Sequence, residues 1–107
     1  MKVKTSELSG AALDWAVAKC EGLQWATWRK DGWSNEWSMG GPIIEREVIN
    51  IGRQAWDDNG VINWGASKSS LFQGAPFSVG PTPLVAAMRC YVASKLGEEV
   101  EVPDEIV

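Results

Sequence analysis

The sequence has no histidine, and this absence removes much of the catalytic chemistry open to a small protein. Histidine is the commonest general base near neutral pH and the commonest metal ligand. Ser-His-Asp and Cys-His catalysis are therefore excluded. The two cysteines, Cys20 and Cys90, cannot by themselves form an ordinary structural zinc site. We expect no catalytic residue, no metal and no cofactor.

Long apolar runs are also missing. The longest, residues 84–88, stops at Arg89, and the N-terminal residues are charged. A membrane-spanning helix needs about 20 apolar residues, and a secretion signal needs about 7–15. We therefore expect a cytoplasmic protein that does not enter a membrane. A reducing cytoplasm keeps cysteines as thiols, so small buried apolar side chains are their simplest explanation.

Phosphate-binding signatures are absent too, since the chain has neither a Gly-x-x-x-x-Gly-Lys loop nor a dinucleotide-binding glycine fingerprint. Enzymes without histidine can use paired carboxylates. The pair Glu45 and Glu47 flanks Arg46, which favours an internal ion pair, and the pair Asp57 and Asp58 precedes an Asn-Gly turn. Neither pair is typical of a catalytic site, so we expect a protein that is not an enzyme.

The net charge of -4 comes from the C-terminal end of the chain. Residues 98–107 hold five of the 14 acidic residues, which leaves nine acids against ten Lys and Arg in residues 1–97. The sequence therefore predicts a nearly neutral body with an acidic, solvated tail. Duplex DNA is an unfavourable partner for such a body, because DNA-binding surfaces are strongly basic.

The 107 residues have room for one domain, residues 1–107, with one modest core. A domain of this size gains stability from association, so a homo-oligomer is the default expectation. Apolar stripes at helical spacing predict two main helices, over residues 9–21 and 83–96, each followed by glycine. Thr82 is a good cap for the second helix, and Pro83 suits its first position.

Between these helices the pattern is less regular. Residues 33–42 are predicted as a loop, because nothing in them repeats at the helical or the strand period. A helical turn is predicted from residue 42. Short strands are predicted at residues 3–7, 23–29, 48–51 and 61–64, with a turn at 56–60 and a loop at 67–80. The expectation is an α+β fold, in which a small antiparallel sheet packs with the two main helices.

Tryptophan is the most unusual part of the composition, with seven in 107 residues. Indole rings are rigid, stack on nucleobases and attract cations over their faces. Trp15 and Trp64 fit the core. Trp33 and Trp37 fall in the predicted loop beside glycines, where burial is hard to arrange without a ligand or partner. We predict that the rings between residues 25 and 37 form a binding surface.

The start of the second helix is a further candidate. The N–H groups of a first helical turn can bind an anion, and the residues before Thr82 are small. Capping by Thr82 explains the same residues without a ligand, and it is the simpler explanation. If this helix start met the Trp-rich loop in space, the two would supply the parts of a nucleotide pocket.

Three segments carry a resemblance to a known family. They are residues 11–22 (AALDWAVAKCEG), 40–47 (GGPIIERE) and 80–97 (GPTPLVAAMRCYVASKLG). In these segments the chain resembles the NinX-like proteins, small proteins of lambdoid and related phages and prophages. The resemblance implies a phage-encoded protein that acts in the bacterial cytoplasm. It supplies no activity, so no functional residues can be transferred from it.

The leading hypothesis is a non-enzymatic phage accessory protein that binds and sequesters a small nucleotide-like molecule of host defence signalling. Trp rings would stack on this ligand, and the glycines would allow it to approach the backbone closely. Arginines would neutralise its phosphate, and Thr82 would mark an anion-binding helix start. The residues proposed for this site are Trp25, Trp28, Trp33, Trp37, Gly40, Gly41, Arg46, Thr82 and Arg89.

Three alternatives remain open. The same Trp residues would serve as anchors in an inhibitor of a host defence or regulatory protein. Trp25, Trp28, Arg29, Lys30 and Trp33 would suit single-stranded nucleic acid, although the nearly neutral body argues against it. A carboxylate-based hydrolase comes last, because it lacks a motif.

Overall fold

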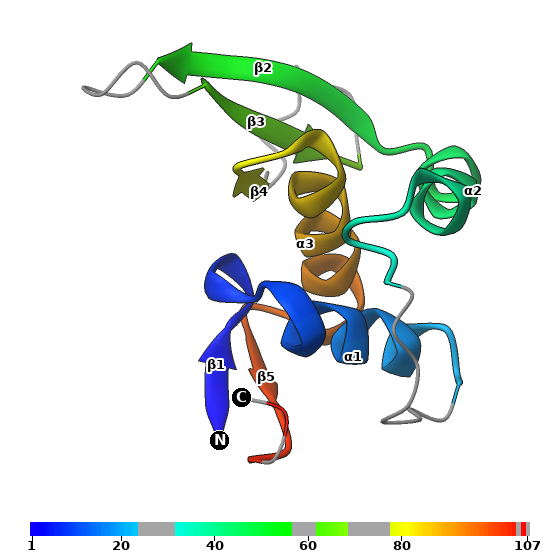
Figure 1. Cartoon of the computed structure of the whole chain (residues 1–107), viewed down its shortest axis with the longest axis vertical. Coiled ribbons are helices and arrows are strands. Elements are labelled where there is room, and N and C mark those ends of the chain that lie inside the picture. The colour runs from blue at the N-terminus through cyan, green and yellow to red at the C-terminus, as the bar shows by residue number, and fades with distance from the viewer. Residues whose placement is uncertain (24–31, 57–61, 69–77, 105, 107) are drawn as a thin grey trace.

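The computed structural model describes residues 1–23, 32–56, 62–68, 78–104 and 106. These residues form three α-helices and two small antiparallel sheets, which confirms the α+β class (Figure 1). In chain order the elements are β1 (Lys2–Lys4), the 3-10 turn η1 (Thr5–Glu7), α1 (Gly10–Cys20), α2 (Trp37–Glu47), β2 (Asn50–Trp56), β3 (Ile62–Ser67), β4 (Ser78–Gly80), α3 (Pro83–Leu96) and β5 (Glu99–Glu101).

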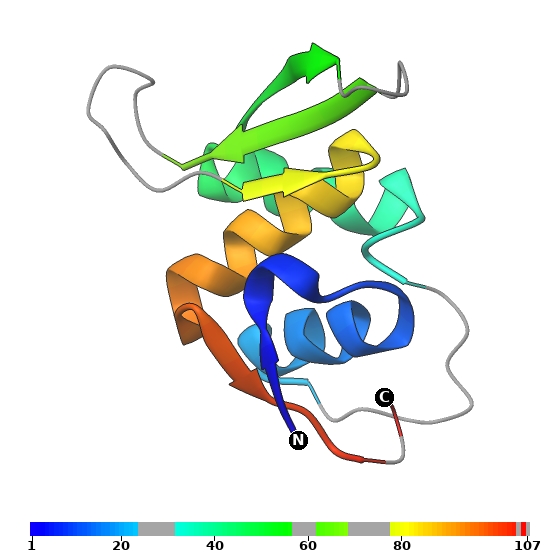
Figure 2. The same ribbon diagram turned by 90° about the vertical axis from the view of Figure 1, so that its left-hand side faces the viewer.

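The central element is α3, which spans the residues predicted for the second main helix. At its start, the Thr82 hydroxyl oxygen accepts a hydrogen bond from the Val85 N–H at 3.1 Å. At its end, Gly97 has φ +90°, which favours glycine, and the chain turns there into β5. Figures 1 and 2 show α3 between the three-stranded sheet and the layer formed by α1 with β1 and β5. Its buried residues, which form the middle of the core, are Leu84, Ala86, Ala87, Met88, Cys90, Tyr91 and Val92.

The first main helix is confirmed as α1, which packs on α3 through an apolar stripe. Leu13, Ala16 and Val17 are fully buried in this contact. Ser9 occupies the predicted cap position, but its side chain makes no capping hydrogen bond. None of the helices in the described ranges is both long and apolar enough to cross a membrane.

The strands form two sheets instead of the single predicted sheet. β2, β3 and β4 are antiparallel neighbours in that order, with Asn50 opposite Ser67 at one end of the β2–β3 pair and Trp56 opposite Ile62 at the other. β4 lies inside the predicted loop at residues 67–80. β1 pairs separately with β5, which brings the two ends of the chain together. The predicted strand at residues 23–29 and most of the turn at 56–60 lie outside the described residues.

The acidic C-terminal segment is attached to the body through its valines. Val100 of β5 and Val102 just after it are buried, whereas Glu98, Glu99 and Glu101 are exposed. This alternation is that of a strand with one face on the core. The segment therefore presents its carboxylates to solvent while its backbone completes the β1–β5 sheet.

The prediction of a loop over residues 33–42 is wrong in its second half, because α2 begins at Trp37. Two glycines and Pro42 give this segment a low helix propensity. Tertiary packing overrides that propensity, since Gly40 and Ile43 lie one turn apart and are both buried. Pro42 cannot donate to the Ser38 carbonyl, but both residues are exposed, so water can reach that carbonyl.

A buried carboxylate fixes the approach to α2. Asp14 of α1 accepts a hydrogen bond from the Ser34 N–H through Oδ1 at 2.9 Å. Gly32 packs so closely that a Cβ at this position would lie 2.6 Å from Asp14 Cγ. The turn that follows Gly32 places the Trp33 side chain in the core.

Candidate functional site

The structure describes seven of the nine predicted binding residues. Trp25 and Trp28 lie outside the described residues, so their predicted roles stay predictions. The other seven lie in the turn before α2, in α2 itself, at the cap of α3 and in the middle of α3. The burial and contacts of each residue show whether it stabilises the fold or is exposed and able to bind a partner.

The two tryptophans of the predicted loop have opposite environments. Trp33 is only 5% exposed and belongs to the hydrophobic core, so its ring offers no free face for stacking. The expectation that it would need a ligand is wrong, because the ring is buried within the hydrophobic core. Trp37, at the first position of α2, is 56% exposed. Among the described members of the predicted tryptophan cluster, Trp37 alone presents its ring to solvent.

The two predicted glycines also differ. A Cβ at Gly40 would lie 2.6 Å from the Trp33 carbonyl oxygen and would collide with the Leu84 side chain. Gly40 therefore serves the close packing of α2 on α3, not the approach of a ligand. A Cβ at Gly41 would meet nothing within 4 Å, so this position borders open space.

Arg46 is the centre of a hydrogen-bonded network. Its Nη1 and Nη2 donate to the two carboxylate oxygens of Glu21 at 3.0 and 2.7 Å, and its Nε donates to Glu47 at 3.0 Å. The Tyr91 hydroxyl donates to Glu21 at 2.5 Å, and Lys68 Nζ donates to Glu47 at 2.8 Å. The predicted internal pair of Arg46 with Glu47 is confirmed. The network joins α1, α2, α3 and the end of β3.

The network keeps its acidic groups ionised. The hydrogen bond from Lys68, together with that from Arg46, lowers the pKa of Glu47 to about 2. The hydrogen bond from Arg46 also lowers the pKa of Glu21. Burial, followed by the hydrogen bond to Glu21, raises the pKa of the Tyr91 hydroxyl. The Arg46 charge is thus balanced internally by two carboxylates, which weakens its predicted role as a phosphate-binding group.

This network should make the protein sensitive to acid. A carboxyl whose pKa is lower in the folded state stabilises that state above its unfolded pKa, and this contribution disappears as the pH falls towards the folded pKa. We expect the melting temperature to fall from pH 4.5, the ordinary pKa of Glu47, towards its folded value of about 2. Thermal unfolding followed by circular dichroism across this range measures the effect.

Two variants test whether this acid sensitivity comes from Glu47. Glu47→Gln should flatten the dependence of melting temperature on pH, since it removes one of the two titrating groups. Lys68→Met should move the loss of stability to higher pH, because the hydrogen bond from Lys68 contributes most to the lowered pKa of Glu47. An unchanged pH profile in Glu47→Gln would mean that the ionisation of Glu47 contributes nothing to stability.

Arg89 also serves the fold. Its Nε donates to the Leu8 carbonyl at 2.7 Å, and its Nη1 donates to the Val79 carbonyl at 2.8 Å. These bonds attach the residue after η1 and the middle of β4 to α3. Burial lowers the pKa of Arg89, although an arginine remains charged at neutral pH. Its predicted role in phosphate binding would compete with both backbone contacts.

The helix start at Thr82 has its simpler explanation. The Thr82 side chain caps α3 through Val85, as described above. It therefore occupies a first-turn N–H group that an anion would use. The helix start of α3 and the exposed Trp37 belong to different elements of the fold.

The outward side of α2 remains as an open surface, which we call the Trp37 face. It comprises Trp37, Ser38, Gly41, Pro42 and Glu45, all of them exposed except Gly41, which is half-buried. Figure 1 shows α2 at the periphery of the molecule, with α3 on its inner side. Beyond its end, Val48 is 67% exposed and has φ +53°, a conformation that β-branched residues rarely adopt.

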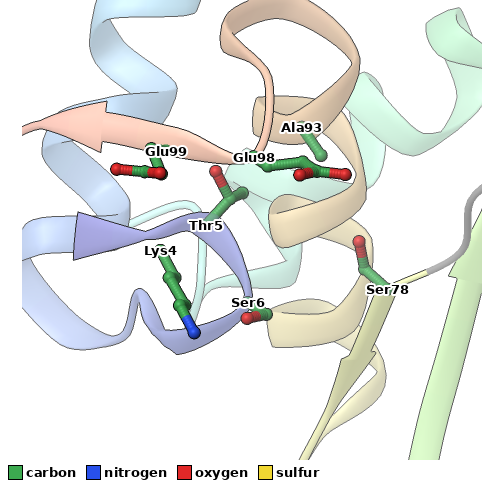
Figure 3. Close-up of a pocket in the computed structure, with 7 residues that line it drawn as sticks. All are labelled: Lys4, Thr5, Ser6, Ser78, Ala93, Glu98 and Glu99. Carbon is green, nitrogen blue, oxygen red and sulfur yellow. The ribbon is translucent and has the colours of Figure 1, made fainter. Parts of the chain in front are cut away.

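A polar hollow lies elsewhere, between η1, β4, the second half of α3 and the start of β5 (Figure 3). It has a volume of about 380 Å³ and is lined by Lys4, Thr5, Ser6, Ser78, Ala93, Glu98 and Glu99. The sequence carried no signal for it, because the lining residues come from four separate segments and form no motif. No group of three or more acidic or cysteine side chains in the described ranges is placed to hold a metal ion.

Comparison with known proteins places the chain in a family. The protein-family model described as Bacteriophage P22, NinX matches residues 26–95, well over half of the chain. A comparison with curated proteins finds no match. The matched range includes the segment at residues 40–47 and nearly all of the segment at residues 80–97, which carried the resemblance in the sequence. The chain belongs to the NinX family of bacteriophage P22.

Proposed function

We propose that this protein is a non-enzymatic phage accessory protein that binds a protein of the bacterial host through the Trp37 face. The observation that carries the proposal is the 56% exposure of Trp37 at the start of α2. Tryptophan is strongly enriched among the residues that dominate binding energy at protein interfaces. A large ring presented on a helix, a rigid element, loses little conformational entropy when a partner covers it.

The surroundings of Trp37 suit insertion into a partner pocket. Gly41 lies one helical turn further along the same side and leaves open space beside the ring. Glu45 follows after another turn, is exposed and forms none of the ion pairs in the described part of the chain. A matching partner would offer an apolar pocket for the indole with a basic group beside it.

A protein partner fits the described residues better than the nucleotide-like ligand of the leading sequence hypothesis. Arg46 and Arg89, the groups assigned to phosphate, are held by carboxylates and backbone carbonyls. Trp33 is buried and Thr82 caps a helix. Nucleotide sequestration would therefore use Trp25, Trp28, Trp37 and Gly41, without the predicted phosphate-binding groups. Single-stranded nucleic acid would use Trp25 and Trp28 with Arg29 and Lys30.

Site-specific photocrosslinking in bacterial cells tests the proposal. The photoreactive residue p-benzoylphenylalanine is introduced in place of Trp37, and in a control in place of Val79, which is exposed on β4 and far from α2 in Figure 1. We expect the probe at residue 37 to label one host protein that the probe at residue 79 does not label. Labelling of a second copy of this chain instead would indicate a homo-oligomer and overturn the proposal.

The labelled protein, once purified, allows a quantitative check by isothermal titration calorimetry. We expect Trp37→Ala to weaken binding by about 30-fold or more, the loss typical of a residue at the centre of an interface. Val79→Ala serves as the matched truncation of an exposed apolar side chain and should leave the affinity unchanged. Because Trp37 is mostly exposed, its truncation should change the free energy of unfolding by no more than about 0.5 kcal/mol. A Trp37→Ala affinity equal to that of the parent would contradict the proposal.

A further inference from the structure

The backbone that surrounds the polar hollow is held in place by hydrogen bonds. Thr5 forms its floor, since its hydroxyl donates to the Gly97 carbonyl at 2.6 Å and its N–H donates to the Glu98 carbonyl at 2.8 Å. Arg89 attaches the walls that carry Ser6 and Ser78, because it binds the carbonyls of Leu8 and Val79 at once. The backbone around the hollow is therefore fixed by four hydrogen bonds between segments distant in the sequence.

Five polar side chains of the hollow have no partner within the described part of the chain. Those of Lys4, Ser6, Ser78, Glu98 and Glu99 take part in none of the side-chain hydrogen bonds or ion pairs of the described residues. Lys4 and Glu99 lie opposite each other in the β1–β5 pair, yet they form no ion pair. Figure 3 shows Lys4 directed towards Ser6, while the Glu98 carboxylate lies on the side of Ser78.

The hollow thus offers two unlike ends. A cation with a hydroxyl lies at one end, Lys4 with Ser6, and a carboxylate with a hydroxyl lies at the other, Glu98 with Ser78. Its volume of about 380 Å³ falls within the range of roughly 300–1,000 Å³ that small-molecule sites occupy. None of its lining residues in the described part of the chain is aromatic, so these residues provide no surface on which a nucleobase would stack.

We propose that this hollow binds a small zwitterion of the amino-acid type, with the ligand ammonium at Glu98 and Ser78 and the ligand carboxylate at Lys4 and Ser6. A purely anionic ligand would be repelled by Glu98 and Glu99, and a purely cationic one by Lys4. A molecule with both charges satisfies both ends. The site is independent of the Trp37 face, because no residue belongs to both.

A matched ligand series tests this assignment. Linear ω-amino acids of two to six carbons are titrated into 15N-labelled protein, together with the alkylamine and the alkanoate of each length. We expect one chain length of the amino acids to shift the amide signals of Ser6, Ser78 and Glu98 in a saturable manner, and the matched amine and acid to bind at least about fivefold more weakly. Equal binding of an amine or an acid would overturn the proposal, as would the absence of saturation with every amino acid.

Charge-removing variants provide the second arm. Lys4→Met and Glu98→Gln should each weaken binding of the preferred amino acid about five- to tenfold, the loss of one charged contact at an open site. The controls are Lys2→Met, which removes the same charge from the same strand, and Glu7→Gln, an exposed acid of η1; neither residue lines the hollow. These surface residues tolerate substitution, so folding is preserved in all four variants. Equal losses in controls and site variants would mean that net charge, not the hollow, governs binding.

Discussion

The variant Arg89→Met should lose about 3 kcal/mol of unfolding free energy. Methionine retains much of the apolar stem of arginine but cannot donate the hydrogen bonds to the Leu8 and Val79 carbonyls. A hydrogen bond from a charged donor contributes about 1.5–3 kcal/mol, and a partly buried carbonyl left without a partner costs more than an exposed one. Urea denaturation followed by far-UV circular dichroism measures the change through the transition midpoint.

Lys95→Met is the matched control for this prediction. Lys95 lies in the last turn of the same helix, is exposed and makes no side-chain hydrogen bond among the described residues, so its replacement should change stability by less than about 0.5 kcal/mol. A stable Arg89→Met protein would show that the two backbone contacts are dispensable. If that stable variant also lost a nucleotide-dependent rise in melting temperature seen in the parent, the phosphate-binding role predicted from the sequence would be restored.

The two helices that the sequence predicted have local signals at their ends. The boundaries of α3 follow from Thr82, Pro83 and Gly97, each of which acts on the backbone next to it. α1 follows from the apolar stripe of Leu13, Ala16 and Val17. Such features are encoded within a few residues, so a single sequence is sufficient to find them.

α2 could not be predicted in the same way, because its stability comes from contacts distant in the sequence. Gly40 and Pro42 indicate a loop when they are considered locally. In the fold, Gly40 permits the helix to approach Leu84, which lies 44 positions further along the chain. Asp14 holds the Ser34 N–H beside Trp33, and the Trp33 ring lies in the core, so a ring predicted to bind a ligand is a core residue.

The roles predicted for the arginines of the site also failed to account for contacts that are distant in the sequence. Arg46 and Arg89 were assigned to phosphate because arginine commonly binds it, but their partners in the fold are Glu21 and the carbonyls of Leu8 and Val79. Only the pairing with the adjacent Glu47 was visible in the sequence. The polar hollow could not be predicted from the sequence, because it forms only when β1, β4, α3 and β5 pack together.

The adjacent glycines of α2 should respond very differently to the same substitution. Gly40→Ala should lower the free energy of unfolding by about 2 kcal/mol, the usual cost of overpacking, because its Cβ would lie 2.6 Å from the Trp33 carbonyl oxygen. Gly41→Ala should change it by less than about 0.5 kcal/mol, because its Cβ would meet nothing within 4 Å beyond its chain neighbours, and the gain in helix propensity is offset by the steric restriction on a residue that precedes Pro42. Urea denaturation of both variants measures the difference.

A double-mutant cycle with Leu84→Ala shows where the cost at Gly40 arises. The Leu84 side chain is one of the two groups that the new Cβ would strike, so Gly40→Ala should cost less when Leu84 is already truncated. Part of the loss of stability should persist, because the Trp33 carbonyl belongs to the backbone and cannot change its rotamer as a side chain can. Gly41→Ala should have the same effect in both backgrounds. If Gly40→Ala and Gly41→Ala changed stability equally, the close packing of α2 on α3 at Gly40 would contribute nothing to stability.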